Sequence, residues 1–377
     1  MNQLKRRVPV AQPLLDEAET RCVNDALAKG AISGFYGDYL PKFEEEFAAY
    51  CDCRFGVATS NGTTALHLAL AALSIGEGDE VLVSTLTNMA TFFAVIYQNA
   101  KPVPVDIDPR TLNMDPRLLE RKITPRTKAV LVVHLFGHPC DMDPILEVAR
   151  KHNLLVIEDC AEAHGATYKG RKVGGLGDAG CFSFYANKII TTGEGGMVTT
   201  NNAQLADRAR NLKGLAFGDH NKFMHKDIGF NYRMTNLQAA IGHAQFGKIE
   251  SIIAAKRRIA AFYTSRLGDL EELELPVEMP YARNVYWMYH ILLRGRAAAR
   301  RGVVMRRLAD LGIETREGFL PYNMQEIFIH RGWTRADECP VANDVAHRGF
   351  YLPSGPGLRD DELDYVASGL TEVLRSL

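Results

Sequence analysis

The sequence predicts an α/β protein with two domains, a large one built on a mostly parallel central sheet flanked by helices and a small α+β domain at the C-terminus. Three observations lead to this prediction. The chain has 377 residues, more than the roughly 100–200 that one domain usually holds. Up to about residue 250, amphipathic stretches alternate with short apolar runs, which is typical of βαβ units. Beyond that point the elements are fewer and mixed.

The expected helices of the large domain carry apolar residues at spacings of three and four. Two of them run up to a glycine, Gly30 and Gly76, which favours the end of a helix. These helices cover residues 14–29, 63–74, 89–99 and 144–152. After Thr235 the same spacing continues to about residue 267, and we expect one long helix there that bridges the two domains.

The expected strands of the large domain are short and mostly rich in β-branched or aromatic residues. They cover residues 81–84, 102–106, 129–134, 154–158, 181–185 and 197–200. Their apolar character is nearly continuous rather than alternating. This pattern indicates strands that are buried on both faces, as in a parallel sheet.

The C-terminal part predicts a small domain of mixed elements. We expect a strand at residues 286–293, a helix at 303–311, a strand that ends near Arg316 and a last helix at 361–374. We therefore assign residues 1–250 to the large domain and 251–377 to the small domain. The sequence leaves open that the N-terminal segment packs with the small domain.

Composition argues against several kinds of partner. The 44 Lys and Arg nearly balance the 45 Asp and Glu, so no broad field attracts nucleic acid or an anionic membrane. Apolar runs stay far below the roughly 18 residues of a membrane span, and the N-terminal region lacks the apolar stretch of a signal peptide. Seven scattered cysteines without a CxxC pair fit free thiols. We expect a cytoplasmic protein.

Carboxylates follow the apolar strand expected at residues 154–158. Open α/β sheets bind ligands outside the carboxyl ends of their strands, so polar residues there are the first candidates for chemistry. Asp159 stands at that position, and Glu162 follows three residues later. Taken alone, an aspartate in this place is equally well explained as the cap of a following helix.

A second segment delivers one lysine to a glycine-rich loop. The aromatic strand at 181–185 leads to Lys188, and Gly193-Glu-Gly-Gly follows. A lysine is usually a solvated surface charge. Between an aromatic strand and glycines it can be desolvated, which lowers its pKa enough to make it a Schiff-base nucleophile. The glycines also allow backbone N–H groups to face a phosphate.

A third segment, Ser-Asn-Gly-Thr-Thr at residues 60–64, opens a predicted helix. Free N–H groups and the helix dipole at such an end attract phosphate, although an ordinary N-cap explains the same residues. The three segments together meet the needs of one cofactor. Pyridoxal phosphate requires donors for its phosphate, a carboxylate for its pyridine nitrogen and an amine for its aldehyde. The sequence therefore predicts pyridoxal phosphate as the cofactor.

Longer motifs point to a family. They lie at residues 60–70, 133–142, 158–165, 182–198, 230–236 and 352–354. As they stand, they resemble the nucleotide-sugar aminotransferases among the fold-type I pyridoxal-phosphate enzymes, and the likeness covers nearly the whole chain. Glu-Asp-Cys-Ala-Glu-Ala and Asn-Tyr-Arg-Met-Thr-Asn are most similar to GDP-perosamine synthases, which aminate C4 of a GDP-linked 4-keto-6-deoxymannose.

The resemblance implies roles for residues at matching positions. Lys188 would be the Schiff-base lysine, Asp159 would pair with the pyridine nitrogen, and Glu162 would lie near the ring oxygen of the cofactor. The phosphate would contact Gly62, Thr63 and Ser183. Relatives also bring an asparagine from the neighbouring subunit to this phosphate. The matching residue is Asn231, so the resemblance implies a homodimer with shared active sites.

Two positions depart from the pattern of the relatives. Most relatives place an aromatic residue at the position of Asn88, where it stacks on the cofactor ring. Here Asn88 would form hydrogen bonds instead, or Phe92 or Phe93 would supply the aromatic face. Perosamine synthases tend to read Tyr-Pro-x-His where residues 319–322 read Phe-Leu-Pro-Tyr. We therefore expect that a contact to the sugar has changed.

The implied reaction is the transamination of GDP-4-keto-6-deoxymannose to GDP-perosamine, or of a close analogue, with glutamate or possibly glutamine as amino donor. A C3 aminotransferase, or an aminotransferase for another nucleotide-linked keto sugar, is the alternative among enzymes. Outside enzymes, the alternative is a module that senses a ligand without catalysis. The sequence offers no means of identifying the nucleotide base.

A cluster of potential metal ligands is set aside. His134, His138 and Cys140 include good zinc ligands, but no fourth ligand is evident and the resemblance implies no metal. Cys160 is interpreted as a packing residue, since an apolar surrounding raises the pKa of a thiol. His164, two residues beyond Glu162, is equally well explained by a place near the cofactor or by simple packing.

Overall fold

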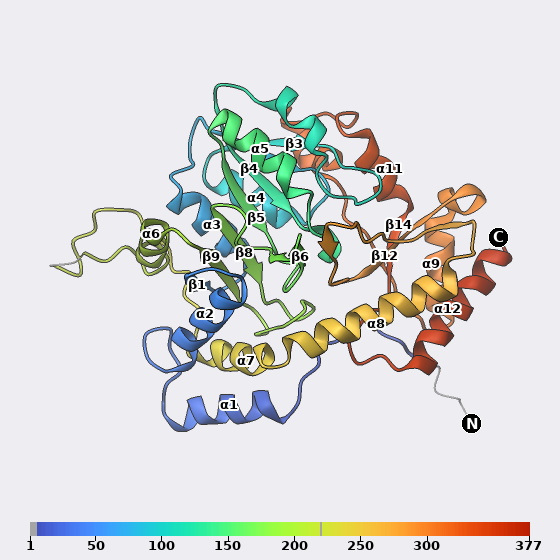
Figure 1. Ribbon diagram of the computed structural model, residues 1–377, viewed down its shortest axis with the longest axis horizontal. Coiled ribbons are helices and arrows are strands. Elements are labelled where there is room, and N and C mark those ends of the chain that lie inside the picture. Colours follow the sequence, from blue (N-terminus) through green and yellow to red (C-terminus); the bar gives the residue numbers. More distant parts are fainter. Residues whose placement is uncertain (1–5, 219–220) are drawn as a thin grey trace.

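The computed structural model describes residues 6–218 and 221–377, and it confirms the α/β fold with a mostly parallel central sheet (Figure 1). In the described residues this sheet has seven strands, in the order β1-β9-β8-β5-β4-β2-β3. They are β1 (Phe55–Thr59), β2 (Glu80–Ser84), β3 (Lys101–Val105), β4 (Thr127–Val133), β5 (Leu155–Asp159), β8 (Ala179–Ser183) and β9 (Gly196–Thr200). Only β9 runs against its neighbours, β1 and β8.

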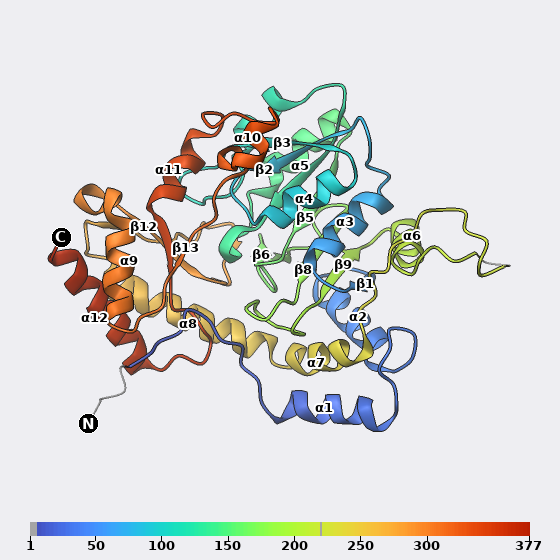
Figure 2. The same ribbon diagram turned by 180° about the vertical axis from the view of Figure 1, so that it is seen from behind.

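Helices cover both faces of the central sheet. They are α1 (Glu17–Ala28), α2 (Tyr39–Tyr50), α3 (Gly62–Ala72), α4 (Met89–Tyr97), α5 (Met142–His152) and α6 (Ala203–Lys213). Figures 1 and 2 show α3 and α4 on one face and α5 on the other. The four predicted helices are present with shifted ends. The first begins at Glu17 because Asp16 and Glu19 form a capping box there. Helices α2 and α6 were not expected.

The single long helix expected from residue 235 to 267 is wrong. The segment forms two helices, α7 (Asn236–Phe246) and α8 (Ile249–Leu267), separated at Gly247 and Lys248. Glycine weakens a helix at this point, and Lys248 forms ion pairs with Asp16 and Glu19 beside the break. In the part of the chain that the structure describes, no helix has both the length and the apolarity needed to cross a membrane.

A second sheet lies in the C-terminal part. Its order is β10-β12-β14-β13, and all its pairings are antiparallel. These strands are β10 (Leu273–Glu274), β12 (Tyr289–Leu293), β13 (Arg316–Glu317) and β14 (Gly349–Leu352). The expected strand at 286–293 begins only at Tyr289, because Tyr286 has a left-handed backbone with φ of +47°. Strand β14, which lies inside this sheet, was not expected.

The remaining elements complete both parts. The helices are α9 (Arg301–Asp310), α10 (Glu326–His330), α11 (Pro340–Arg348) and α12 (Asp360–Arg375), and a small third sheet joins β6 (Thr167–Tyr168), β7 (Arg171–Lys172) and β11 (Ala282–Arg283). The described residues form two hydrophobic clusters. Helix α8 contributes Ile252 to the first and Tyr263 to the second, and Val8 from the N-terminal segment belongs to the second. The domain boundary near residue 250 stays a prediction, and residues 1–5 lie outside the described ranges.

The strand pairing brings three carboxyl ends to one edge of the central sheet. In the register, Asp159 at the end of β5 lies between Val133 on β4 and Cys181 on β8. Strand β8 ends at Ser183, five residues before Lys188. Two of the three segments predicted to carry chemistry, those of Asp159 and Lys188, therefore start from neighbouring strands.

Candidate active site

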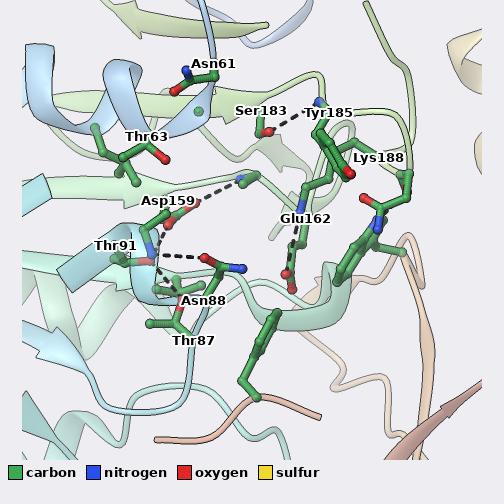
Figure 3. A pocket seen from close by; sticks show the side chains of 18 of the residues that line it. Asn61, Thr63, Thr87, Asn88, Thr91, Asp159, Glu162, Ser183, Tyr185 and Lys188 are labelled. Atoms are coloured by element: carbon green, nitrogen blue, oxygen red, sulfur yellow. Dashed lines mark hydrogen bonds and ion pairs between the residues drawn. The ribbon is translucent and has the colours of Figure 1, made fainter. Parts of the chain in front are cut away.

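A cavity of about 650 Å³ lies at this edge, and side chains from both sheets line it. The structure brings together seven of the eight residues that the sequence predicts for the site: Gly62, Thr63, Asn88, Asp159, Glu162, Ser183 and Lys188. Figure 3 shows Lys188 and Glu162 facing each other, with Asp159 further along the same cavity. Asn231 does not line it.

The start of helix α3 forms one end of the cavity. Asn61 caps the helix, because its side chain accepts a hydrogen bond from the Thr64 N–H at 2.9 Å. The earlier N–H groups of the helix have no acceptor within it. A Cβ on Gly62 would lie 2.6 Å from the Cβ of Ser183. Only glycine at residue 62 allows the start of α3 to approach the end of β8 this closely. The free N–H groups of the helix start and the Ser183 hydroxyl therefore lie near each other.

Asp159 is buried and held in a fixed orientation. Its Oδ2 accepts a hydrogen bond from Thr91 Oγ1 at 2.8 Å, and its Oδ1 accepts one from the Ala161 N–H at 3.1 Å. Burial raises the pKa of this carboxyl, and the two hydrogen bonds and Lys188 oppose the rise. No helix follows Asp159 directly in the described residues, so the simple helix-cap interpretation does not hold. A cationic partner in the cavity would stabilise its charged form.

Lys188 and Glu162 form a buried pair whose Nζ and Oε1 are 3.8 Å apart. Burial lowers the pKa of Lys188, while Glu162 and Asp159 oppose the shift. Burial raises the pKa of Glu162 to about 7, and Lys188 opposes that rise. Glu162 Oε2 also accepts the Phe136 N–H at 2.8 Å. Both shifts favour the neutral forms of the two groups, so Lys188 gives up its proton more readily than an exposed lysine does.

The loop of Lys188 turns back at once into strand β9. The Lys188 N–H donates to the Tyr185 carbonyl at 2.9 Å, which forms a tight turn. Gly193 then adopts a left-handed backbone with φ of +81°, and its N–H donates to Thr191 Oγ1 at 2.8 Å. Lys188 is thus carried by a short loop that is fixed at both ends rather than by an extended surface segment.

Two functional side chains were missed by the sequence analysis. Thr91 orients Asp159, and the ring centroid of Trp287 lies 4.0 Å from Lys188 Nζ. An aromatic face at this distance stabilises an ammonium group. Thr91 lies one turn into a helix and Trp287 in the expected strand of the small domain. Neither place carries a local signal for such a contact.

Asn88 lines the cavity but places no aromatic ring there. Its side chain accepts the Ala90 N–H at 3.0 Å and caps helix α4. The two suggested replacements for the missing ring are wrong. Phe92 is fully buried and stacks on Tyr322, with ring centroids 4.1 Å apart, and Phe93 does not line the cavity. In most relatives an aromatic side chain at this position covers one face of the cofactor ring. Here the side-chain amide of Asn88 would contact that face.

The loop at residues 319–322 is only partly a cavity wall. Phe319 lines the cavity, as expected for a segment that contacts the sugar. Tyr322 does not, because its ring is fully buried between Phe92 and Phe328. We expected a changed contact to the sugar in this loop. For Tyr322 this expectation is wrong, because its side chain does not reach the cavity.

Asn231 is exposed and lies outside the cavity of its own chain. It pairs with Gly214, and its neighbour Tyr232 accepts the Ser60 N–H through its carbonyl at 2.8 Å. The described residues 221–228 project from the body of the molecule, as Figure 1 shows beyond α6. Phe223, in this segment, is 79% exposed. A role of Asn231 in a neighbouring subunit stays a prediction.

The histidines near β4 have hydrogen-bond partners. His134 Nε2 lies 3.0 Å from Glu158 Oε2 in the buried core, and His134 Nδ1 accepts the Cys140 N–H at 3.0 Å. His134, Glu158 and Cys160 lie close enough to hold an ion, but both nitrogens of the imidazole are already engaged. Glu158 also accepts three backbone N–H groups, those of Gly174, Leu176 and Gly177. This cluster is a hydrogen-bonded support on the side of β5 away from Asp159.

His164 does not line the cavity. Its ring is fully buried against the aromatic rings of Phe47, Phe182 and Phe184. Burial lowers its pKa to about 3, so the imidazole is neutral. Packing explains this histidine better than contact with a cofactor.

The residues present fit pyridoxal phosphate. The start of α3, which only glycine at residue 62 allows to approach Ser183, is suited to a phosphate. A protonated pyridine nitrogen would stabilise the charged form of the buried Asp159, and Lys188 offers the amine. The cavity also has room for a further ligand beside the cofactor.

Comparisons with known proteins identify the family of this chain. GDP-perosamine synthase of Caulobacter vibrioides is 46% identical over 98% of this chain and 98% of its own length. The solved structure of DesV from S. venezuelae is 34% identical, covers 97% of this chain and 98% of that one, and has a TM-score of 0.90. Spr1654 of Streptococcus pneumoniae, solved in its PLP-form, is 26% identical, with coverages of 98% and 99% and a TM-score of 0.93. Residues 13–371 match the model of the DegT/DnrJ/EryC1/StrS aminotransferase family, and this chain therefore belongs to that family.

Proposed function

We propose that this aminotransferase uses pyridoxal phosphate to move an amino group from glutamate to C4 of a GDP-linked 4-keto-6-deoxymannose, which yields GDP-perosamine. The relative that is 46% identical over almost the full length is named GDP-perosamine synthase, and this supports the substrate. The observation that carries the proposal is the buried pair of Lys188 and Glu162 in the same cavity as Asp159.

Each predicted residue has a defined task in this proposal. Lys188 would hold the cofactor through its Nζ, and Asp159 would keep the pyridine nitrogen protonated. Gly62, Thr63 and Ser183 would bind the phosphate. Pyridoxal phosphate, when bound, supplies an electron sink for the bond that breaks at the donor's α-carbon. Asn88 would face the ring of the cofactor.

Lys188 would then move the proton. Its amine, with a pKa that burial lowers, would take the proton from the α-carbon of glutamate and hold it at Nζ for its return later in the reaction. Glu162, 3.8 Å from Nζ, would exchange a proton with the amine because burial raises the pKa of this carboxyl to about 7. With the keto sugar the same transfers would run in the opposite order, and ping-pong kinetics would follow.

The proposal includes a homodimer with shared sites. Asn231 is exposed and outside the cavity of its own chain, and exposed apolar residues of the projecting segment, among them Phe223 and Ile228, are suited to a protein contact. Asn231 of one copy would complete the phosphate site of the other. We also propose a cytoplasmic location, supported by seven cysteines that are unpaired in the described structure.

The alternatives have weaker support. A module that only senses a ligand has no need of a desolvated lysine beside a buried carboxyl, and the chain matches an aminotransferase family over residues 13–371. A C3 aminotransferase would use the same cofactor residues. Product analysis therefore has to decide the position of the new amine.

The test is mass spectrometry of the products from GDP-, UDP- and dTDP-linked keto sugars, each offered with glutamate and with glutamine, followed by NMR of the amino sugar. We expect an amine at C4 of the GDP-linked 6-deoxy sugar, formed with glutamate. Selective turnover of a UDP- or dTDP-linked sugar, or an amine at C3, would refute the proposed substrate while leaving the aminotransferase intact.

A further inference from the structure

Lys256 is a buried lysine without a counter-ion. It lies on α8, the helix that contributes residues to both hydrophobic clusters, and it is only 2% exposed. No carboxylate of the described residues pairs with it, and burial lowers the pKa of its amine to about 7. Burying a lysine in this way costs free energy unless its N–H groups find acceptors.

Two backbone carbonyls provide those acceptors. Lys256 Nζ donates to the Trp287 carbonyl at 2.8 Å and to the Ser354 carbonyl at 2.6 Å. Trp287 precedes β12 and Ser354 follows β14, and these strands are neighbours in the second sheet. A neutral amine retains two N–H groups, so both hydrogen bonds persist in either protonation state. The lysine thus fastens two strand ends to α8.

Trp287, whose backbone Lys256 holds, also contacts the active site. Its Nε1–H donates to the Asn187 carbonyl at 2.8 Å, and its ring lies 4.0 Å from Lys188 Nζ. The indole is therefore held at its backbone by Lys256 and at its edge by the residue before Lys188. Only these two attachments and the surrounding packing decide whether the ring faces the amine.

We propose that Lys256 is a positioning residue for Lys188 and acts through Trp287. By holding the Trp287 backbone, it keeps the indole face against the Lys188 amine and closes that side of the cavity. The inference rests on the proposed function only in taking Lys188 as the reactive amine. A purely structural lysine would fasten the same carbonyls without affecting the surroundings of Lys188.

The first readout needs no cofactor. The chain has two tryptophans, so Trp333→Phe leaves Trp287 as the only one. In this background we expect Lys256→Met to shift the emission of the cofactor-free protein to longer wavelength and to increase acrylamide quenching several-fold. Lys248→Met is the matched control, because Lys248 pairs with Asp16 and Glu19 instead. Unchanged emission and quenching in folded Lys256→Met would overturn the proposal.

The second readout is the pH at which the visible absorbance of the cofactor-loaded protein changes. Loss of the aromatic face should lower this midpoint by about one unit in Lys256→Met and in Trp287→Leu. If Lys256 acts through Trp287, the double variant shifts no further than Trp287→Leu alone. Additive shifts would contradict the proposal. Should Lys256→Met not fold, Lys256→Gln takes its place in both readouts, with the same outcomes. A protein that shows these spectral changes but transfers no amino group would refute the proposed function alone.

Discussion

Thr91 Oγ1 donates a hydrogen bond to Asp159 Oδ2 at 2.8 Å, and both side chains are buried. Helix α4 and strand β5 carry the two residues, so the orientation of the carboxylate depends on how this helix packs on the sheet. Thr91 Oγ1 also lies 2.9 Å from Thr87 Oγ1. The carboxylate is thus oriented by a short chain of hydroxyl groups before any cofactor binds.

Thr91→Val removes this hydrogen bond with little change in volume. Without the donor, the charged form of Asp159 loses stabilisation, and the carboxylate holds a pyridine nitrogen less firmly. We expect cofactor affinity to fall about tenfold, measured by titrating the cofactor-free protein with pyridoxal phosphate. Thr87→Val removes a hydroxyl that contacts Thr91 but not Asp159, so it should lower the affinity less than Thr91→Val does. An affinity in Thr91→Val equal to that of the wild type would show that Thr91 does not orient Asp159.

Gly62→Ala should damage the phosphate end of the cavity. The new Cβ would lie 2.6 Å from the Cβ of Ser183, and 3.1 Å from its Oγ, so the start of α3 must move away from β8. We expect cofactor affinity to fall more than about tenfold, because the N–H donors no longer converge with the hydroxyl. Gly76→Ala is the control, since its nearest neighbour would be a carbonyl at 3.8 Å. Equal affinities in the two variants would speak against this phosphate site.

Glu162 should make stability depend on pH in an unusual direction. Burial raises its pKa from 4.5 to about 7, so the folded protein binds a proton that the unfolded chain has already lost. The contribution of Glu162 to the free energy of unfolding therefore falls as pH rises from about 4.5 to about 7, and it stays constant above that range. In the cofactor-free protein, Glu162→Gln should gain stability relative to the wild type over this range, by up to about 3 kcal/mol.

Urea unfolding from pH 5 to pH 8 measures this difference. Glu45→Gln, a change at an exposed glutamate, is the control and should follow the wild type. A stability difference between Glu162→Gln and the wild type that stays constant across the range would contradict the raised pKa of this carboxyl.

Mixing two inactive variants tests the shared site. Lys188→Ala lacks the amine, and Asn231→Ala should lack the residue that the neighbouring copy needs. In a mixed dimer one site receives an intact Lys188 and an intact partner asparagine. After unfolding and refolding together in equal amounts, activity should recover to about one quarter of the wild type. No recovery, with dimers shown by light scattering, would place Asn231 outside the partner's site.

Much of the site follows from local sequence. Asp159 and Ser183 end the apolar strands β5 and β8, which pair in parallel with each other, and ligands bind at that edge of open sheets. Gly62 follows the residue that caps α3, a pattern readable over a few residues. These predictions needed only the order of elements and the chemistry of their ends.

The rest depends on contacts between distant segments. Trp287 reaches Lys188 because the chain turns sharply at Tyr286 instead of continuing as a strand, and no pattern in the sequence marks that turn. Tyr322 was expected near the sugar, but its aromatic ring is accommodated by Phe92 in the core. The break between α7 and α8 has a local sign in Gly247, but the apolar spacing runs through it, and the ion pairs of Lys248 with Asp16 and Glu19 join distant segments.

The central claim is that Lys188 is the reactive amine, and a single-turnover experiment with Lys188→Ala tests it most directly. The variant protein, loaded with pyridoxal phosphate, is mixed with glutamate, and the visible absorbance and release of 2-oxoglutarate are followed. We expect a loss of transamination of at least about a thousandfold with unchanged folding, since the proton transfer loses its base. Formation of 2-oxoglutarate and amino sugar at the wild-type rate would contradict it.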